Sequence, residues 1–209
     1  MTSAPPRPDD LLSPLGRSHG RPTWPLAPRT DGLAGRTVGL LDNSKQNAGL
    51  FLDEIEALLR QAGVGDVLRF RKPTAAISAG EDIGRIAERC DALVNAYGDC
   101  GSCTSWCVHD SVDVEREGVP VATVNTAEFA TLGRFEAGAL GMAALPIVVI
   151  PHPVGSLDEA RVRDCARAAL PDIVTVLTRD ASDSRTDYRS AAGGQVAKAA
   201  SGEDCGCAA

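Results

Sequence analysis

The sequence predicts an α/β protein with a flavodoxin-like or Rossmann-like three-layer fold around a mostly parallel sheet of five strands. Short apolar runs alternate with longer stretches of helical periodicity, the pattern that builds a parallel sheet covered by helices on both faces. A chain of 209 residues with 44% apolar content can bury one sizeable core. The alternation is confined to the middle of the chain, so we expect a single domain with tails.

The two ends differ from the middle in composition. Residues 1–34 are rich in proline and have little apolar periodicity, which predicts a disordered leader. Residues 180–209 are polar and rich in Ala, Gly and Ser, which predicts a flexible tail, and this tail ends in Cys205-Gly206-Cys207. The predicted α/β domain therefore covers residues 35–179.

Within the domain, strands are predicted over 37–41, 67–70, 92–97, 119–124 and 146–150. Helices are predicted from Leu50 to Gly63 and over 81–90, 104–117, 126–142 and 171–177, with another that starts at Ser156. Thr126 is a good N-cap residue, and Ser156 with Glu159 has the spacing of a capping box.

Composition narrows the class of protein. The formal net charge is −7 and the basic residues are interspersed with acids, so nucleic acid is not an expected partner. The longest apolar stretch, 138–150, is shorter than the ~20 residues that span a bilayer, and the N-terminus lacks a secretory h-region. We therefore expect no membrane contact and a cytoplasmic location, where seven cysteines favour catalytic, redox or metal-binding roles.

Polar and reactive side chains follow several of the predicted strands. In open parallel sheets, ligands bind outside the carboxyl ends of the strands, near the point where the strand order reverses. The segments expected at that edge are 42–47, 98–103, 125–128 and His152. The sequence therefore places a candidate small-molecule site there.

The Cys-Gly-Ser-Cys segment after the third strand is the strongest chemical signal. A Cys-x-x-Cys pair at a helix N-terminus can form a small disulfide, and the helix dipole stabilises the first thiolate. Cys100 is the candidate nucleophile, Cys103 the candidate resolving thiol, and Ser102 a candidate cap or anion donor. Gly101 would let the backbone turn tightly. The alternative is that both cysteines are small buried residues of a strand-to-helix turn.

The segment 98–106, Gly-Asp-Cys-Gly-Ser-Cys-Thr-Ser-Trp, followed by Val108-His109-Asp110, resembles the UGSC-type family. The likeness extends from about Gly35 to Leu177, with weaker patches at 42–45 and 151–153. Members of that family carry selenocysteine where this chain has Cys100. The resemblance implies a redox-active nucleophile at Cys100 and supplies no substrate.

Other candidates each have a structural alternative. Lys45 is placed to pair with a substrate carboxylate or to lower the pKa of Cys100, unless it is only solvated. His109 is a candidate general acid or base that alternatively hydrogen-bonds Asp110 or a backbone carbonyl. His152, between two prolines, suits a positioned ligand or proton donor, or rigid loop packing. Asn43 and Asn125 are candidate substrate-binding amides.

The remaining cysteines allow several interpretations. Cys107 lies four residues after Cys103, so the three sulfurs could converge on a zinc ion if a fourth ligand joined them, either His109 or a tail cysteine. Cys205 and Cys207 are a candidate redox relay, because a flexible arm ending in two thiols could carry electrons to the Cys100 pair. Cys90 and Cys165 are expected in the core.

Three functions fit these observations. The first is a thiol-dependent redox enzyme acting on a small molecule, supplied with electrons by a thioredoxin-like donor. The second is a non-redox racemase or lyase in which Cys100 moves a proton. The third is a zinc-binding or redox-sensing module. No Gly-x-Gly-x-x-Gly or P-loop pattern is present, so no cofactor is expected, and association into a homo-oligomer is compatible with a site at a sheet edge.

Overall fold

The computed structural model describes residues 23–179 and 186–189. The six strands are β1 (Thr37–Asp42), β2 (Asp66–Arg71), β3 (Ala92–Gly98), β4 (Val121–Thr126), β5 (Ile147–Ile150) and β6 (Asp187–Tyr188). The helices are α1 (Ala48–Gln61), α2 (Asp82–Arg89), α3 (Gly101–Arg116), the 3-10 turn η2 (Ala127–Phe129), α4 (Ala130–Ala139) and α5 (Glu159–Thr178).

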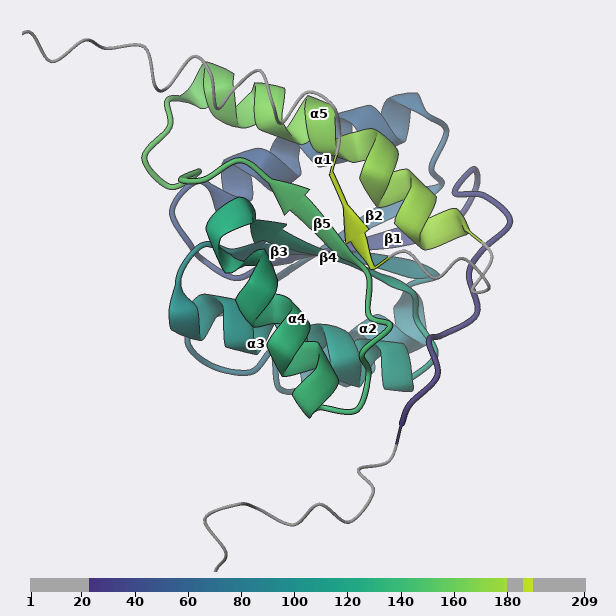
Figure 1. The fold of residues 1–209 in the computed structure, drawn as a ribbon. Helices are drawn as coiled ribbons and strands as arrows, with labels where there is room; N and C mark the ends of the chain where they lie inside the picture. The colour runs from purple at the N-terminus through teal and green to yellow at the C-terminus, as the bar shows by residue number, and fades with distance from the viewer. Residues whose placement is uncertain (1–22, 180–185, 190–209) are drawn as a thin grey trace, which may run out of the picture.

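All six strands run parallel, in the order β2-β1-β3-β4-β5-β6. Helices α1 and α5 cover one face, and α2, α3 and α4 cover the other (Figure 1). The predicted α/β fold with a parallel sheet between two helical layers is therefore confirmed. The first five strands follow the order 2-1-3-4-5 of flavodoxin-like sheets, which reverses direction between β1 and β3.

The central strands read as continuous apolar runs because both of their faces are covered. Every residue of β3, β4 and β5 is buried. The larger part of the core lies under α1 and α5 and includes Phe51, Ile55 and Val162. This rigid centre fixes the positions of the loops at the strand ends.

The sheet has six strands, so the prediction of five was wrong by one. The extra strand, β6, lies in the predicted tail and pairs with the start of β5. It contains only two residues, too few for sequence periodicity to reveal. Arg134 holds it in place, since its guanidinium lies 2.7 Å from Asp187 Oδ1 and donates to the Thr186 carbonyl at 2.6 Å.

Helix α5 also differs from the prediction, which divided it into two segments. It runs unbroken through Pro171, although proline removes one helical hydrogen bond. Its N-cap is Asp158, whose carboxylate accepts from the Arg161 amide at 3.0 Å, and not Ser156. Because seven side chains of the helix are buried, packing on the sheet and α1 outweighs the effect of the proline.

Residues 23–34, which composition places in the leader, lie against the domain. The Trp24 amide donates to the Gly141 carbonyl at 2.8 Å, and Arg29 forms a buried ion pair with Glu115 at 2.8 Å. The Ala27 amide donates to the same Glu115 carboxylate at 2.7 Å. The packed part of the chain thus begins before Gly35, whereas residues 1–22 lie outside the described structure.

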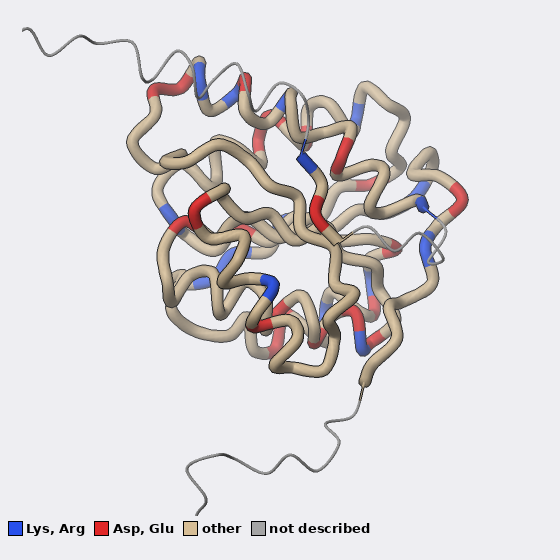
Figure 2. The backbone as a smooth tube through the Cα atoms, in the orientation of Figure 1, with Lys and Arg blue, Asp and Glu red and all other residues tan. Residues whose placement is uncertain are grey.

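Charged residues of both signs are distributed over the outer helices (Figure 2). On α5 they form ion pairs, such as those of Arg163 with Glu159 at 2.8 Å and with Glu54 at 3.0 Å. Among the helices of residues 23–179, none combines the length and apolarity needed to cross a bilayer.

Candidate functional site

Loops at the carboxyl ends of β1, β3 and β5 are joined by hydrogen bonds into one edge of the sheet. Asn43 Nδ2 donates to the Tyr97 carbonyl at 2.8 Å, and the Tyr97 hydroxyl donates to the Gln46 carbonyl at 2.5 Å. Asn47 Nδ2 donates to the Val154 carbonyl at 3.0 Å. The prediction that these loops meet at one edge of the sheet is therefore confirmed. Asn43 is buried and links β1 to β3.

Cys100 and Cys103 lie at the start of α3, which begins at Gly101 and not near residue 104 as predicted. Cys100 is the N-cap residue with extended backbone, and its Sγ accepts from the Cys103 amide at 3.4 Å. Cys103 is fully buried, its Sγ donates to the Cys100 carbonyl at 3.3 Å, and it accepts from the Asp99 amide at 3.2 Å. The positive end of the α3 dipole therefore faces the Cys100 sulfur.

The two thiols have opposite pKa shifts. Partial burial alone would raise the pKa of Cys100. Four interactions outweigh it and lower that pKa: hydrogen bonds from the Cys103 side chain and amide, the charge of Lys45 and a contact with Ser102. Burial, together with the Cys100 hydrogen bond, raises the pKa of Cys103 to about 11. Of the two thiols, Cys100 is therefore the one that ionises first, and Cys103 is the one that keeps its proton.

The backbone before α3 passes close to the Asn125 and Thr104 side chains, and this close packing requires a glycine at position 98 rather than at 101. A Cβ at position 98 would lie 2.5 Å from Asn125 Oδ1 and 2.6 Å from Thr104 Oγ1, whereas one at position 101 would meet open space. Gly101 is also absent from the glycines of positive φ in the described residues. The expectation that Gly101 provides the turn was therefore wrong.

The β1 loop brings Lys45 into electrostatic reach of both thiols, since its charge lowers the pKa of each. Ser44 before it has a left-handed φ of 61°, which non-glycine residues adopt rarely. The Ser44 amide donates to Asp42 Oδ1 at 2.7 Å, and the Lys45 amide donates to Asn43 Oδ1 at 3.1 Å. These bonds fix the turn that carries Lys45.

Asp99 and His152 form a contact that sequence analysis missed. His152 Nδ1 lies 2.9 Å from Asp99 Oδ1 and 3.1 Å from Thr126 Oγ1. The Asp99 side chain is 6% exposed and that of His152 is 29% exposed. Asp99 directly precedes Cys100, which is the one signal that could have pointed to it. Thr126 makes no side-chain cap at the following helix, contrary to the prediction, because its hydroxyl is used here.

Asn125, a predicted substrate-binding amide, is fully buried. Its side chain is buried between Gly98 and Gly133, and neither of its polar atoms has a hydrogen-bond partner in the described part of the chain. It therefore contacts the backbone of the site from behind.

His109 and Cys107 are not brought together with the thiol pair. His109 lies eight residues into α3, about 12 Å along the axis from its start, and its ring contacts Trp106 at 5.4 Å. Cys107 Sγ points at the sheet, 3.7 Å from the Asn95 carbonyl and 3.9 Å from that of Val124. Burial strongly raises the pKa of Cys107. The zinc alternative, in which the three sulfurs converge, is therefore not what the structure shows, because the Cys107 side chain faces the core.

The five cysteines of the described segments are free thiols, and Cys90 and Cys165 are buried in the core as predicted. Within those segments, no group of three His, Cys, Asp or Glu residues is placed to hold a metal ion. Cys205 and Cys207 lie outside the described residues.

The family model of the UGSC family matches residues 10–179. The chain belongs to the UGSC family. The match begins well before Gly35, and it includes the segment 23–34 that packs on the domain. The match ends at Arg179, one residue after α5. β6 and the two tail cysteines of this UGSC protein therefore lie beyond it. No curated protein matches the chain.

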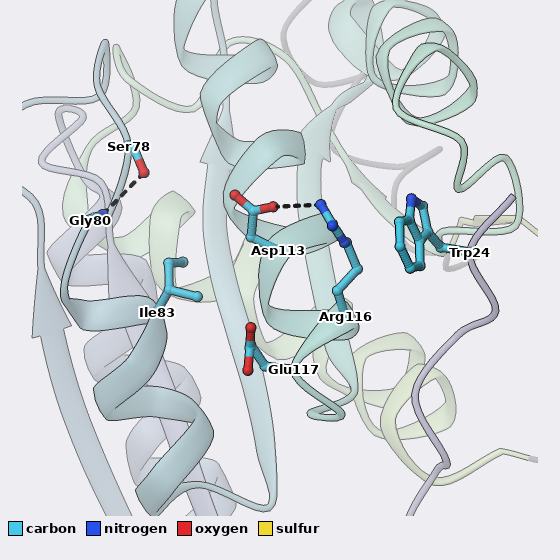
Figure 3. A pocket seen from close by; sticks show the side chains of 7 residues that line it. All are labelled: Trp24, Ser78, Gly80, Ile83, Asp113, Arg116 and Glu117. Carbon is cyan, nitrogen blue, oxygen red and sulfur yellow. Dashed lines mark hydrogen bonds and ion pairs between the residues drawn. The ribbon is translucent and has the colours of Figure 1, made fainter. Parts of the chain in front are cut away.

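A cavity of about 440 Å³ lies elsewhere in this UGSC protein (Figure 3). Trp24 and Arg116 line it, with the Arg116 guanidinium 4.2 Å from the centre of the Trp24 ring, and Asp113 and Glu117 complete its polar side. Arg116 is the last residue of α3 and Cys100 precedes the first, so the cavity lies about 22 Å along the helix from the thiols. It is separate from the thiol site.

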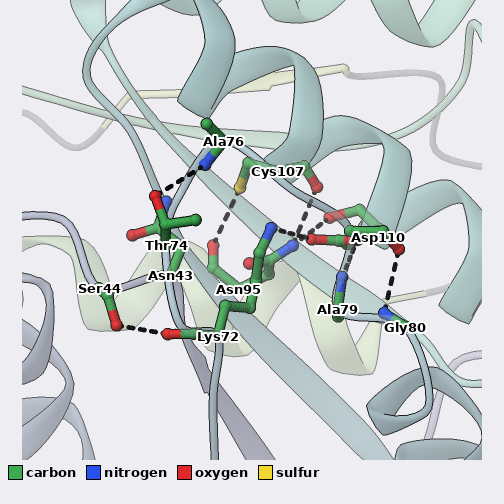
Figure 4. Close-up of polar contacts among 12 residues, drawn as sticks. Asn43, Ser44, Lys72, Thr74, Ala76, Ala79, Gly80, Asn95, Cys107 and Asp110 are labelled. Atoms are coloured by element: carbon green, nitrogen blue, oxygen red, sulfur yellow. Dashed lines mark hydrogen bonds and ion pairs between the residues drawn. The ribbon is translucent and has the colours of Figure 1, made fainter.

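A polar cluster under α3 was also missed. Figure 4 shows its members Lys72, Asn95, Cys107 and Asp110, and Ser111 joins it through Asn95. Lys72 Nζ lies 2.5 Å from Asp110 Oδ2, and the other carboxylate oxygen accepts from the Ala79 amide at 2.8 Å. Asn95 Nδ2 donates to the Cys107 carbonyl at 2.9 Å and to Ser111 Oγ at 3.0 Å. These bonds fix α3 to the sheet and to the loop after β2.

Proposed function

We propose that this protein is a thiol-dependent redox enzyme that reduces a small molecule containing an electrophilic sulfur, such as a low-molecular-weight disulfide. The observation that carries the proposal is the hydrogen-bonded pair at the start of α3. Cys100 has a lowered pKa and is partly exposed, whereas Cys103 is buried with a raised pKa. This asymmetry suits an attacking thiolate and a resolving thiol.

The reaction has two steps. The Cys100 thiolate attacks one sulfur of the substrate R–S–S–R′, forms a bond to that sulfur and releases R′S⁻, which takes up a proton. Cys103 then loses its proton and attacks Cys100 Sγ, which forms the Cys100–Cys103 disulfide and releases the second thiolate. The substrate gains two electrons and the protein loses two.

A dithiol donor of the thioredoxin class restores the reduced pair by disulfide exchange. The charge of Lys45 and the N-terminal amides of α3 favour substrates that carry a carboxylate near the sulfur. Lys45, Ser102 and the α3 amides are therefore the proposed anion contacts.

The test uses oxidised glutathione as substrate and dithiothreitol as donor. Wild-type protein should form a mixed disulfide at Cys100 and then a Cys100–Cys103 bond, both mapped by mass spectrometry. Cys103→Ser should stop at the mixed disulfide, Cys100→Ser should not react, and Cys90→Ala serves as the matched control because Cys90 is buried in the core. Turnover without a disulfide would instead favour proton transfer by Cys100, as in a racemase or lyase.

A further inference from the structure

We propose that His152 is the general acid of the thiol site, held by Asp99 and Thr126 so that Nδ1 keeps its proton and Nε2 gives one to the leaving group of the substrate. The inference rests on the proposed function, because it assigns the group that protonates the first leaving thiolate. Asp99 is a positioning residue that acts through His152.

The oxygens around Nδ1 favour one tautomer of the His152 ring. His152 Nδ1 lies 2.9 Å from a carboxylate oxygen of Asp99, and an ionised carboxylate only accepts. The Thr126 hydroxyl, 3.1 Å from the same nitrogen, donates its single hydrogen to the Gly98 carbonyl at 3.2 Å and so presents a lone pair to the ring. Two oxygens therefore face Nδ1, the Thr126 hydroxyl at hydrogen-bond distance and the Asp99 carboxylate at ion-pair distance, and both favour a proton on Nδ1. Neutral His152 therefore has its lone pair on Nε2.

The ring is held in place from several sides. Phe129 packs against it with ring centres 5.7 Å apart, and the Gly155 amide donates to Asp99 Oδ2 at 3.4 Å. Its side chain nevertheless remains 29% exposed, which leaves part of the imidazole accessible to a ligand. A fixed tautomer with an accessible edge is the arrangement required of a proton-transfer group.

Asp99 connects this ring to the thiols. It directly precedes Cys100 in the chain, its amide donates to Cys103 Sγ at 3.2 Å, and its carboxylate binds His152. One residue thus contacts the resolving sulfur through its backbone and the imidazole through its side chain.

The proton balance of the first step involves this ring. The His152 Nε2–H gives its proton to the leaving thiolate R′S⁻ when Cys100 attacks, and the neutral ring regains a proton from solvent. In the second step Cys103 releases its proton to solvent as it attacks Cys100 Sγ.

The kinetic test compares two disulfide probes whose leaving thiols differ in acidity. Bis(2-hydroxyethyl) disulfide releases a basic alkyl thiolate that needs a proton, whereas 5,5′-dithiobis(2-nitrobenzoate) releases a stable aryl thiolate that does not. His152→Gln should slow single-turnover reaction with the alkyl probe by about 10²-fold, the scale of general acid catalysis, and barely change the aryl probe. His109→Gln is the matched control, because that ring lies two helical turns from the thiols.

An NMR measurement tests the tautomer without any substrate. The chain has three histidines, so the His152 signals are assigned by their loss in His152→Gln. In the neutral ring, ¹⁵N spectra should show a protonated Nδ1 and a pyridine-type Nε2. Asp99→Asn, which can donate where the carboxylate accepts, should shift the ring toward the other tautomer and slow the alkyl probe.

The outcomes separate the two proposals. If wild-type protein modifies Cys100 with both probes but His152→Gln slows them equally or not at all, the role of His152 is wrong and the thiol function stands. A protonated Nε2 in the neutral wild-type ring would also overturn it. If neither probe reacts at Cys100, the proposed function fails and the inference fails with it.

Discussion

Lys72 Nζ lies 2.5 Å from Asp110 Oδ2, and each side chain is only 1% exposed. A buried ion pair contributes little net stability, but removing one partner leaves a buried charge uncompensated. We expect Lys72→Met to lower the free energy of unfolding by about 3–5 kcal/mol. The double variant Lys72→Met with Asp110→Leu should recover most of that loss in urea denaturation.

The pH dependence of the Lys72→Met variant follows from the same pair. Burial raises the pKa of Asp110, and the hydrogen bond and charge of Lys72 act in the opposite direction. Without Lys72, the buried Asp110 carboxyl would stay protonated in the folded state at pH values where it is ionised in the unfolded state. The variant should therefore lose stability as pH rises above about 4, the pKa of an unfolded aspartate. A loss under 1 kcal/mol at pH 7 would contradict this account.

Lys45 tests the electrostatic control of Cys100. Its charge lowers the pKa of that thiol, so Lys45→Met should move the pH profile of Cys100 alkylation to higher pH. A charge of this kind contributes about 0.5 kcal/mol, roughly a twofold slower alkylation at neutral pH. Lys45→Arg keeps the charge and is the control. Iodoacetamide labelling followed by peptide mapping gives the rates, and an unchanged profile in Lys45→Met would rule out this role.

Gly98 tests the packing that supports the α3 start. In Gly98→Ala the new methyl would overlap Asn125 and Thr104, so we expect about 1–3 kcal/mol of destabilisation and slower alkylation of Cys100. Gly101→Ala is the control, because its Cβ would meet open space at an exposed position, and its stability should change by less than about 1 kcal/mol. Denaturant unfolding measures the stability of both variants. If Gly98→Ala were as stable as Gly101→Ala, Asn125 and Thr104 would have moved aside without cost, and the packing role of Gly98 would be wrong.

The tail cysteines provide the last test. If Cys205 and Cys207 relay electrons, deletion of residues 203–209 should slow steady-state turnover with a dithiol protein donor severalfold. It should leave the single-turnover reaction of Cys100 unchanged, because the thiol pair itself is intact. Cys205→Ser with Cys207→Ser should reproduce the deletion, whereas full turnover and an unchanged redox state in the deleted protein would exclude the relay.

Sequence pattern predicted the parts of the fold that have long apolar repeats. The central strands are of this kind, because burial on both faces leaves a continuous signal, and so is α1, whose apolar residues around Phe51 recur at helical spacing. β6 was missed because its two residues carry no period. The interruption of α5 at Pro171 was predicted from local preference, which packing of the helix overrides.

The candidate site was predicted where chemistry and spacing coincide, at Cys100 and Cys103. Asp99 was missed because an aspartate beside a cysteine has no distinctive signal until β5 brings His152 to it. Lys72 and Asp110 were missed for the same reason, since 38 residues separate the partners of that ion pair. Contacts between distant segments depend on strand order, which the sequence shows only indirectly.

The direction of β6 bears on how the tail cysteines would work. It pairs parallel to β5, so at Tyr188 the chain heads toward the carboxyl edge of the sheet, where the thiols lie. The 17 residues from Arg189 to Cys205 could span at most about 55 Å. A tethered dithiol would then act at an effective concentration near the millimolar range. Re-reduction by such a tether would be independent of protein concentration, as expected of an intramolecular reaction.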